Sequence, residues 1–169
     1  TVKEWKADYA QAVQRSRKVA DRMAKGVEFL FRKNKIPLLP GGGALKAKNV
    51  VEVAGKDAAQ ILEAARAVIL ATGSEPKSLP GVAIDEKTVI SSNGAVRNES
   101  RPATLIVIGA GAVGMEFADV YAAYGTQVTV LEALPRVLPV EDEESSALIA
   151  RLFGRRGITI RTALRVKSV

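Results

Sequence analysis

The stretch TLIVIGAGAVGMEF, residues 104–117, decides the fold of this chain. Residues 104–108 form a β-branched, fully apolar run, which is typical of a buried strand in a parallel sheet. Gly109, Gly111 and Gly114 follow at once in Gly-x-Gly-x-x-Gly spacing, and residues 115–124 have the composition of a helix. A strand, a tight glycine turn and a helix in this order predict the first half of a Rossmann-like α/β unit.

The residues that follow continue the same pattern. Gly125 suits a helix C-terminus, residues 127–131 are predicted as a second strand, and Glu132 stands at its end. Glu132 comes 23 residues after Gly109, near the spacing expected of a ribose-binding acid. Residues 141–156 then run from acidic to basic, which suits a helix dipole, and residues 158–160 are predicted as a third strand.

This arrangement predicts a dinucleotide site with a distinct role for each glycine. Gly109 permits the turn, Gly111 lets a pyrophosphate approach the backbone, and Gly114 lets the helix pack closely on the sheet. The amides at the helix N-terminus then face the phosphates. The Glu132 carboxylate accepts hydrogen bonds from ribose hydroxyls and repels the 2′-phosphate of NADP, so NAD is expected. The predicted loop contacts are Gly109, Ala110, Gly111, Ala112, Val113 and Gly114.

The N-terminal half is predicted to begin with one long helix over residues 3–33. Thr1 and Glu4 have capping-box spacing at its start. Apolar or small residues recur every three or four positions, which predicts a stripe that faces a core, with a coiled coil or a membrane-surface helix as alternatives. The stripe consists of Trp5, Tyr9, Ala12, Ser16, Val19, Met23 and Leu30.

Further elements are predicted between this helix and the glycine motif. Pro37 and residues 40–43 indicate a loop, and residues 50–53 a short strand. Residues 58–66 favour helix by propensity, whereas the apolar residues 67–71 indicate a buried strand. Further on, residues 74–82 suggest a crossover between domains, and Ser91 or Ser92 is expected to cap a short helix that reaches Val96.

Composition excludes several classes of site within this chain. The sequence has no cysteine and no histidine, so disulfides, thiolate zinc sites and imidazole acid–base chemistry are excluded. The acidic residues 141–144 are interpreted as a helix N-terminus and not as a metal site, because no other ligand set accompanies them. We therefore expect neither catalytic nor metal-binding residues here.

The charge of the chain raises the alternative of a basic binding module. Ten of the Lys and Arg residues and four of the Asp and Glu residues lie in residues 1–36, so +6 of the net charge of +7 sits there. Nucleic-acid binding predicts aromatic residues among these charges, but Trp5 and Tyr9 lie on the apolar stripe. We expect a solvated helix face, with no nucleic-acid partner.

The apolar runs are too short to span a bilayer, and the N-terminus lacks a signal pattern, so we expect a soluble intracellular protein without a membrane partner.

Several stretches resemble the pyridine nucleotide–disulfide oxidoreductases and, within them, the dihydrolipoamide dehydrogenases. They are VILATGS (68–74), SSNGA (91–95), GAGAVGME (109–116) and VLEALPRVLP (130–139). The resemblance implies a flavin-dependent enzyme that oxidises dihydrolipoamide with NAD as acceptor and uses FAD and NAD as cofactors. It also implies a homodimer that joins 2-oxoacid dehydrogenase complexes in the cytoplasm or mitochondrial matrix. Mercuric reductases and transhydrogenases are the alternatives within the family.

The resemblance also implies domains and individual roles. Residues 1–82 would be part of an FAD-binding domain, with residues 58–66 in β structure, and residues 83–169 an NAD-binding domain. Thr72 and Gly73 would contact the flavin nucleotide, and Gly43 would lie beside the FAD adenosine unless it occupies a plain β-turn. Glu116 would lie near the nicotinamide, or be a solvated helix residue, and Val166 beside the adenine. The redox cysteines and the catalytic histidine–glutamate pair of the family would lie outside this central stretch, so we expect it to be inactive alone.

Overall fold

The computed structural model describes residues 6–56 and 58–169. It confirms the α/β class and divides the chain into two compact units. The first unit comprises residues 1–18 and 76–169, and the second comprises residues 19–75. The domain boundary predicted from the sequence lies between residues 82 and 83, a few residues after Glu75, where the second unit ends. Because helix α1 (Tyr9–Lys33) crosses Lys18, its first turns belong to the first unit.

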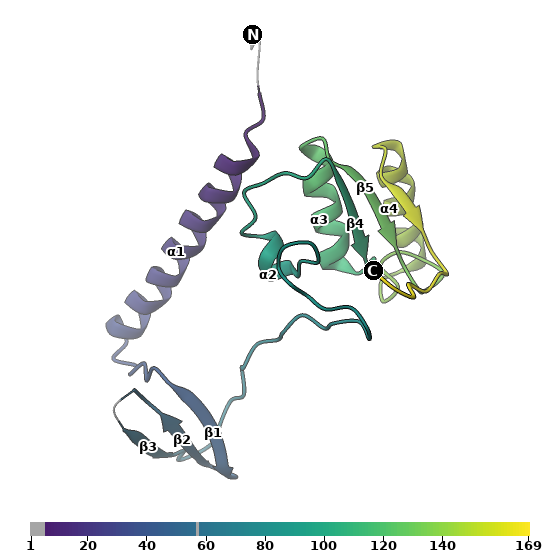
Figure 1. The fold of residues 1–169 in the computed structure, drawn as a ribbon. Coiled ribbons are helices and arrows are strands. Elements are labelled where there is room, and N and C mark those ends of the chain that lie inside the picture. Colours follow the sequence, from purple (N-terminus) through teal and green to yellow (C-terminus); the bar gives the residue numbers. More distant parts are fainter. Residues whose placement is uncertain (1–5, 57) are drawn as a thin grey trace. The chain divides into compact units, whose positions relative to one another are not determined.

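The first unit contains a parallel sheet in the order β4-β5-β6 (Figure 1). Strands β4 (Thr104–Ile108) and β5 (Gln127–Leu131) have the predicted limits, and β6 (Thr159–Arg161) begins one residue later than predicted. Helix α3 (Ala112–Ala123) contacts β4 and β5 and begins three residues before the predicted start. Helix α4 (Glu143–Arg155) contacts β6, with Asp142 as its N-cap. The alternation of strands and helices is therefore confirmed.

The core of this unit lies between α3 and β5. Met115, Ala118 and Tyr121 of α3 and Val128 and Val130 of β5 are buried there. The start of α1 adds an aromatic contact, with the ring centroid of Tyr9 5.5 Å from that of Tyr121 and 5.2 Å from that of Tyr124. Burial raises the pKa of the Tyr9 phenol above its ordinary value, and the neighbouring Tyr121 phenol adds to this shift. The start of α1 and the segment from α3 to β5, which are far apart in the sequence, thus contribute to one core.

Strand β4 is the edge of this sheet among the described residues. Its only neighbour there is β5, and the side chain of Ile106 is 64% exposed. Leu105 and Val107, on the opposite face, pack against the core. An apolar edge strand with free backbone groups is a surface on which another strand can pair.

The second unit contains the remainder of α1 and an antiparallel sheet in the order β1-β2-β3. Strand β2 (Val50–Ala54) confirms the prediction. Strand β1 (Gly42–Ala47) begins within the glycine run that was predicted as loop. Strand β3 (Ala59–Glu63) shows that helix propensity was misleading in residues 58–66, because pairing with β2, for example Glu52 with Ile61, satisfies its backbone instead.

The long helix differs from its prediction in both extent and burial. It begins at Tyr9, where the Asp8 carboxylate accepts a hydrogen bond of 2.9 Å from the amide of Gln11. The proposed cap at Thr1 and Glu4, and Trp5, lie outside the described residues. Among the described residues of the stripe only Tyr9 is buried, and Met23 is 66% exposed; Val13, outside the stripe, is also buried. The expectation of a core-facing stripe is therefore wrong beyond the first turns, because within the second unit, to which residues 19–33 belong, no described element covers them.

The predicted buried strand at residues 67–71 is also absent. This stretch has no regular structure, and Ile69 is 89% exposed. A strand needs a neighbour for its backbone hydrogen-bonding groups, and no described strand pairs with these residues.

The short helix α2 (Ser92–Ala95) is confirmed, with the Ser91 hydroxyl accepting from the amide of Asn93. No helix in the described ranges has both the length and the apolar character needed to cross a membrane.

Candidate functional site

The glycine turn joins β4 to α3 with the backbone geometry that the motif predicts. Gly109 has φ +101°, a conformation that favours glycine, and its amide donates a 2.8 Å hydrogen bond to the carbonyl of Leu131. Gly111 is the N-cap of α3 and supplies no side-chain cap. The first amides of a helix have no intrahelical acceptor, so those of α3 remain available to an anionic group.

The three glycines differ in the space around them. A Cβ added at Gly109 or Gly111 would meet no atom within 4 Å. A Cβ added at Gly114 would overlap the carbonyl oxygen of Gly109 and lie 3.2 Å from Cγ1 of Val107. Gly111 therefore borders open space that a ligand can occupy, whereas Gly114 allows α3 to approach β4.

The carboxylate of Glu132 lies directly against the glycine turn. Its side chain is buried, with Oε2 accepting a 2.7 Å hydrogen bond from the amide of Ala110 and Oε1 a 2.8 Å bond from that of Leu134. Each carboxylate oxygen retains a second lone pair. The acid at the end of β5 and the turn at the end of β4, separated by 22 positions in the sequence, therefore form one site.

A loop over residues 134–141 supports the turn from a second direction. The amide of Leu138 donates a 2.7 Å hydrogen bond to the carbonyl of Ala110, and Leu138 itself has φ +46°. Arg136 of this loop pairs with Glu143 of α4 and donates to the carbonyl of Pro139 at 3.1 Å. Sequence reasoning did not identify Leu138 as part of the site, because a positive φ at leucine has no signature in the sequence.

The other predicted contacts have less distinctive surroundings. Ala110 is fully buried, and Ala112 and Val113 are exposed in the first turn of α3. Glu116 is exposed on α3, and Val166 is half-buried in the coil after β6. In the described residues, no three potential metal-ligating side chains gather into a group.

Three of the predicted contacts belong to the second unit. Gly73 is exposed in coil with φ +78°, which favours glycine, and Thr72 precedes it. Gly43 lies in β1, where an added Cβ would meet only Cγ1 of Val51, at 3.9 Å. The conformation of Gly43 therefore does not itself require a glycine, and the alternative of a plain β-turn at this position is excluded, since Gly43 lies in a strand.

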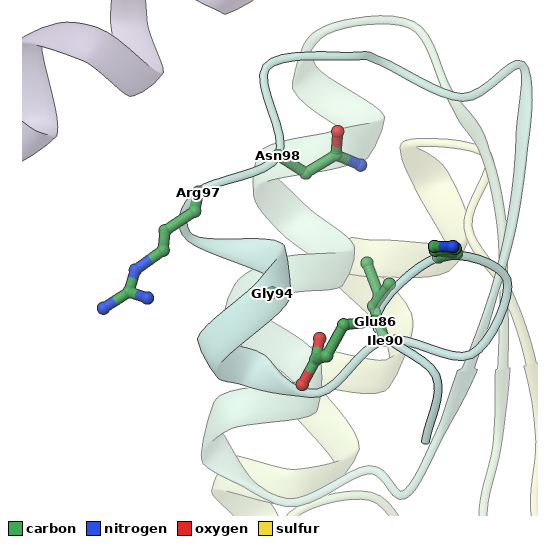
Figure 2. A pocket seen from close by; sticks show the side chains of 6 residues that line it. Glu86, Ile90, Gly94, Arg97 and Asn98 are labelled. Carbon is green, nitrogen blue, oxygen red and sulfur yellow. The ribbon is translucent and has the colours of Figure 1, made fainter. Parts of the chain in front are cut away.

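A pocket of about 360 Å³ lies around α2, away from these residues in the sequence. Figure 2 shows that Arg97 points away from Glu86 and Ile90. The Glu86 carboxylate is already engaged, since it accepts hydrogen bonds from the amide and hydroxyl of Ser91. The lining is Glu86, Lys87, Ile90, Gly94, Arg97 and Asn98, which includes none of the predicted site residues.

Comparison with known proteins gives consistent relatives. The family model described as pyridine nucleotide-disulphide oxidoreductase matches residues 1–169. A dihydrolipoyl dehydrogenase of Chlorobaculum parvum is 40% identical over 99% of this chain and 36% of its own length. One of Zymomonas mobilis is 39% identical over 92% of the chain and 33% of its own length.

Solved structures show the same fold. LpdA from Mycobacterium tuberculosis matches with a TM-score of 0.87 and 25% identity, over 99% of this chain and 38% of that one. The flavoprotein disulfide reductase RclA from Escherichia coli matches with a TM-score of 0.78 and 23% identity, over 96% of this chain and 37% of that one. The chain spans about a third of the length of the curated relatives that it matches. On the family match over its whole length, the chain belongs to the pyridine nucleotide–disulfide oxidoreductases.

Proposed function

We propose that this chain forms the NAD-binding region, and part of the FAD-binding region, of a flavin-dependent dihydrolipoamide dehydrogenase. The observation that carries the nucleotide part is the Glu132 carboxylate bound to the Ala110 amide, beside the open space at Gly111. The substrate part is supported by relatives named dihydrolipoyl dehydrogenase at about 40% identity. The homodimer and the association with 2-oxoacid dehydrogenase complexes are proposed on the same basis.

The residues of the first unit fit a dinucleotide. The pyrophosphate would lie over Gly111, where the free amides of Ala112 and Val113 donate to it and the dipole of α3 favours its charge. The ribose hydroxyls would donate to the remaining lone pairs of Glu132. Glu116 and Val166 are assigned to the nicotinamide and adenine ends. In the second unit, Thr72, Gly73 and Gly43 are assigned to FAD, with the positive φ of Gly73 as the structural support.

When bound, FAD and NAD would supply the redox chemistry, in which two electrons leave a dithiol and reach NAD as a hydride, with one proton released. The residues of this chain bind and orient the nucleotide, since the sequence contains no cysteine or histidine for thiol or imidazole chemistry. The 169 residues alone, supplied with dihydrolipoamide, FAD and NAD, are therefore expected to form no NADH. Turnover in a 340 nm absorbance assay would contradict this assignment.

The nucleotide preference provides a direct test through Glu132. Glu132→Gln keeps an acceptor oxygen but removes the charge that repels a 2′-phosphate. We expect NAD affinity to fall and the preference for NAD over NADP to narrow by about tenfold, the factor given by about 1.4 kcal/mol. Isothermal titration calorimetry with both nucleotides measures this ratio. Glutamine is preferable to alanine, because it retains an acceptor oxygen for one of the two amides, whereas alanine leaves both Ala110 and Leu134 without an acceptor, at a cost of about 1–3 kcal/mol for each buried group.

Glu144→Gln is the matched control, since Glu144 is an exposed glutamate in the first turn of α4. This variant should retain both affinities. Equal binding of NAD and NADP by the unmodified protein would refute the role of Glu132, and failure to bind either nucleotide would refute the proposed function.

A further inference from the structure

Three polar or charged side chains are buried among the described residues, and one of them is not explained by the nucleotide contacts. Glu132 belongs to the site, and the Thr126 hydroxyl donates to the carbonyl of Pro102 at 2.7 Å. The third is Ser146 of α4, which is 1% exposed. Its hydroxyl donates a 3.1 Å hydrogen bond to the carbonyl of Leu138, eight positions earlier in the sequence.

This hydrogen bond departs from the usual behaviour of a helical serine. Such a hydroxyl commonly bonds to the carbonyl four residues earlier in its own helix. For Ser146 that carbonyl belongs to Asp142, and it accepts the amide of Ser146 at 2.9 Å. The hydroxyl instead reaches out of the helix to the loop over residues 134–141, so it connects α4 with the segment that contacts the glycine turn.

Leu138 is the link between Ser146 and that turn. Its φ of +46° is unfavourable for a leucine, so this conformation must be held by its surroundings. The Leu138 carbonyl accepts from Ser146 and from the amide of Glu141, and its amide donates to the carbonyl of Ala110. The amide of Ala110 in turn donates to Glu132. The amide of Ala110 is thus fixed by Glu132, directly after β5, and its carbonyl is fixed from α4 through Leu138.

We propose that Ser146 is a positioning residue for the dinucleotide phosphate loop. It acts through Leu138, which holds the carbonyl of Ala110 and thereby the orientation of the adjoining Gly111 peptide, over which the pyrophosphate would lie. A loop fixed before the ligand arrives avoids the entropy cost of ordering it on binding. This inference rests on the proposed nucleotide function and adds to it a residue that does not touch the nucleotide.

The test compares Ser146→Ala with Ser145→Ala, the same substitution at the neighbouring, exposed position of α4. NAD affinity is measured by calorimetry and stability by thermal unfolding. Hydrogen–deuterium exchange reports on the amides of Ala110 and Leu138 in the nucleotide-free protein. We expect Ser146→Ala to weaken NAD binding by about three- to tenfold, in the range of one hydrogen bond, and to speed exchange at these two amides. Ser145→Ala should change neither.

The outcomes separate this inference from the function on which it rests. If Ser146→Ala lowers the melting temperature but leaves NAD affinity and the two exchange rates unchanged, Ser146 is only a stabilising residue and the proposal is wrong. The unmodified protein provides a second check that does not depend on a variant folding. In it, the Ala110 and Leu138 amides should exchange more slowly than exposed loop amides such as that of Val140, and equal rates would overturn the proposal. If the unmodified protein binds no NAD, the nucleotide function fails, whereas faster exchange at the Ala110 and Leu138 amides in Ser146→Ala would still show that Ser146 positions Ala110.

Discussion

Replacing Gly111 with valine is expected to lower NAD affinity by about a hundredfold while leaving the melting temperature nearly unchanged. Gly111 has φ −72° and ψ 178°, a backbone conformation that valine adopts without strain. An added Cβ meets no protein atom within 4 Å, so the folded chain accommodates it. The valine methyl groups would instead occupy the space proposed for the pyrophosphate and keep it away from the backbone amides of α3. Calorimetric titration with NAD and thermal unfolding of the same sample measure the two effects.

Two further variants make this result specific. Gly111→Ala adds a single methyl group and should give an intermediate loss of affinity. Gly154→Val places the same valine on the exposed part of α4, where an added Cβ is also free of contacts, and should leave NAD binding intact. Normal NAD binding by Gly111→Val would show that no ligand group approaches this position.

Gly114→Ala is expected to have the opposite effect and to destabilise the fold itself. The new Cβ would overlap the carbonyl oxygen of Gly109 and press against Val107, so α3 and β4 must separate. Overpacking of this kind costs about 1–3 kcal/mol. That cost corresponds to a decrease in melting temperature of about 4 °C or more in a unit of this size. Thermal unfolding by circular dichroism, supported by urea titration, measures it.

The control for this second variant is Gly154→Ala, which makes the same substitution inside a helix of the same unit. No atom lies near its added Cβ, and alanine is the better helix former, so stability should stay constant or rise slightly. A melting temperature for Gly114→Ala equal to that of Gly154→Ala would show that α3 does not depend on a glycine at this crossing.

The sequence alone determined the elements whose signals are local. Strands β4 and β5 were predicted to the residue, because β-branched apolar runs end at glycine or at a charged residue. The spacing of Glu132 from the glycine motif also predicted that it belongs to the same dinucleotide site, and the structure places it against the turn because the parallel neighbours β4 and β5 end at the same edge of the sheet. The capped helices α2 and α4 followed from their first residues.

Tertiary structure decided the remainder. Residues 59–63 form a strand against their helix propensity because β2 offers a partner, and residues 67–71 form none because no described strand does. The burial of α1 ends after its first turns for the same kind of reason, since burial depends on what covers a face and not on its periodicity. The support of the phosphate loop by Leu138 and Ser146 was also absent from the sequence pattern. The positive φ of Leu138 and the hydrogen bond from the buried Ser146 hydroxyl to the Leu138 carbonyl both result from contacts between separate segments. Those contacts form only when the chain has folded.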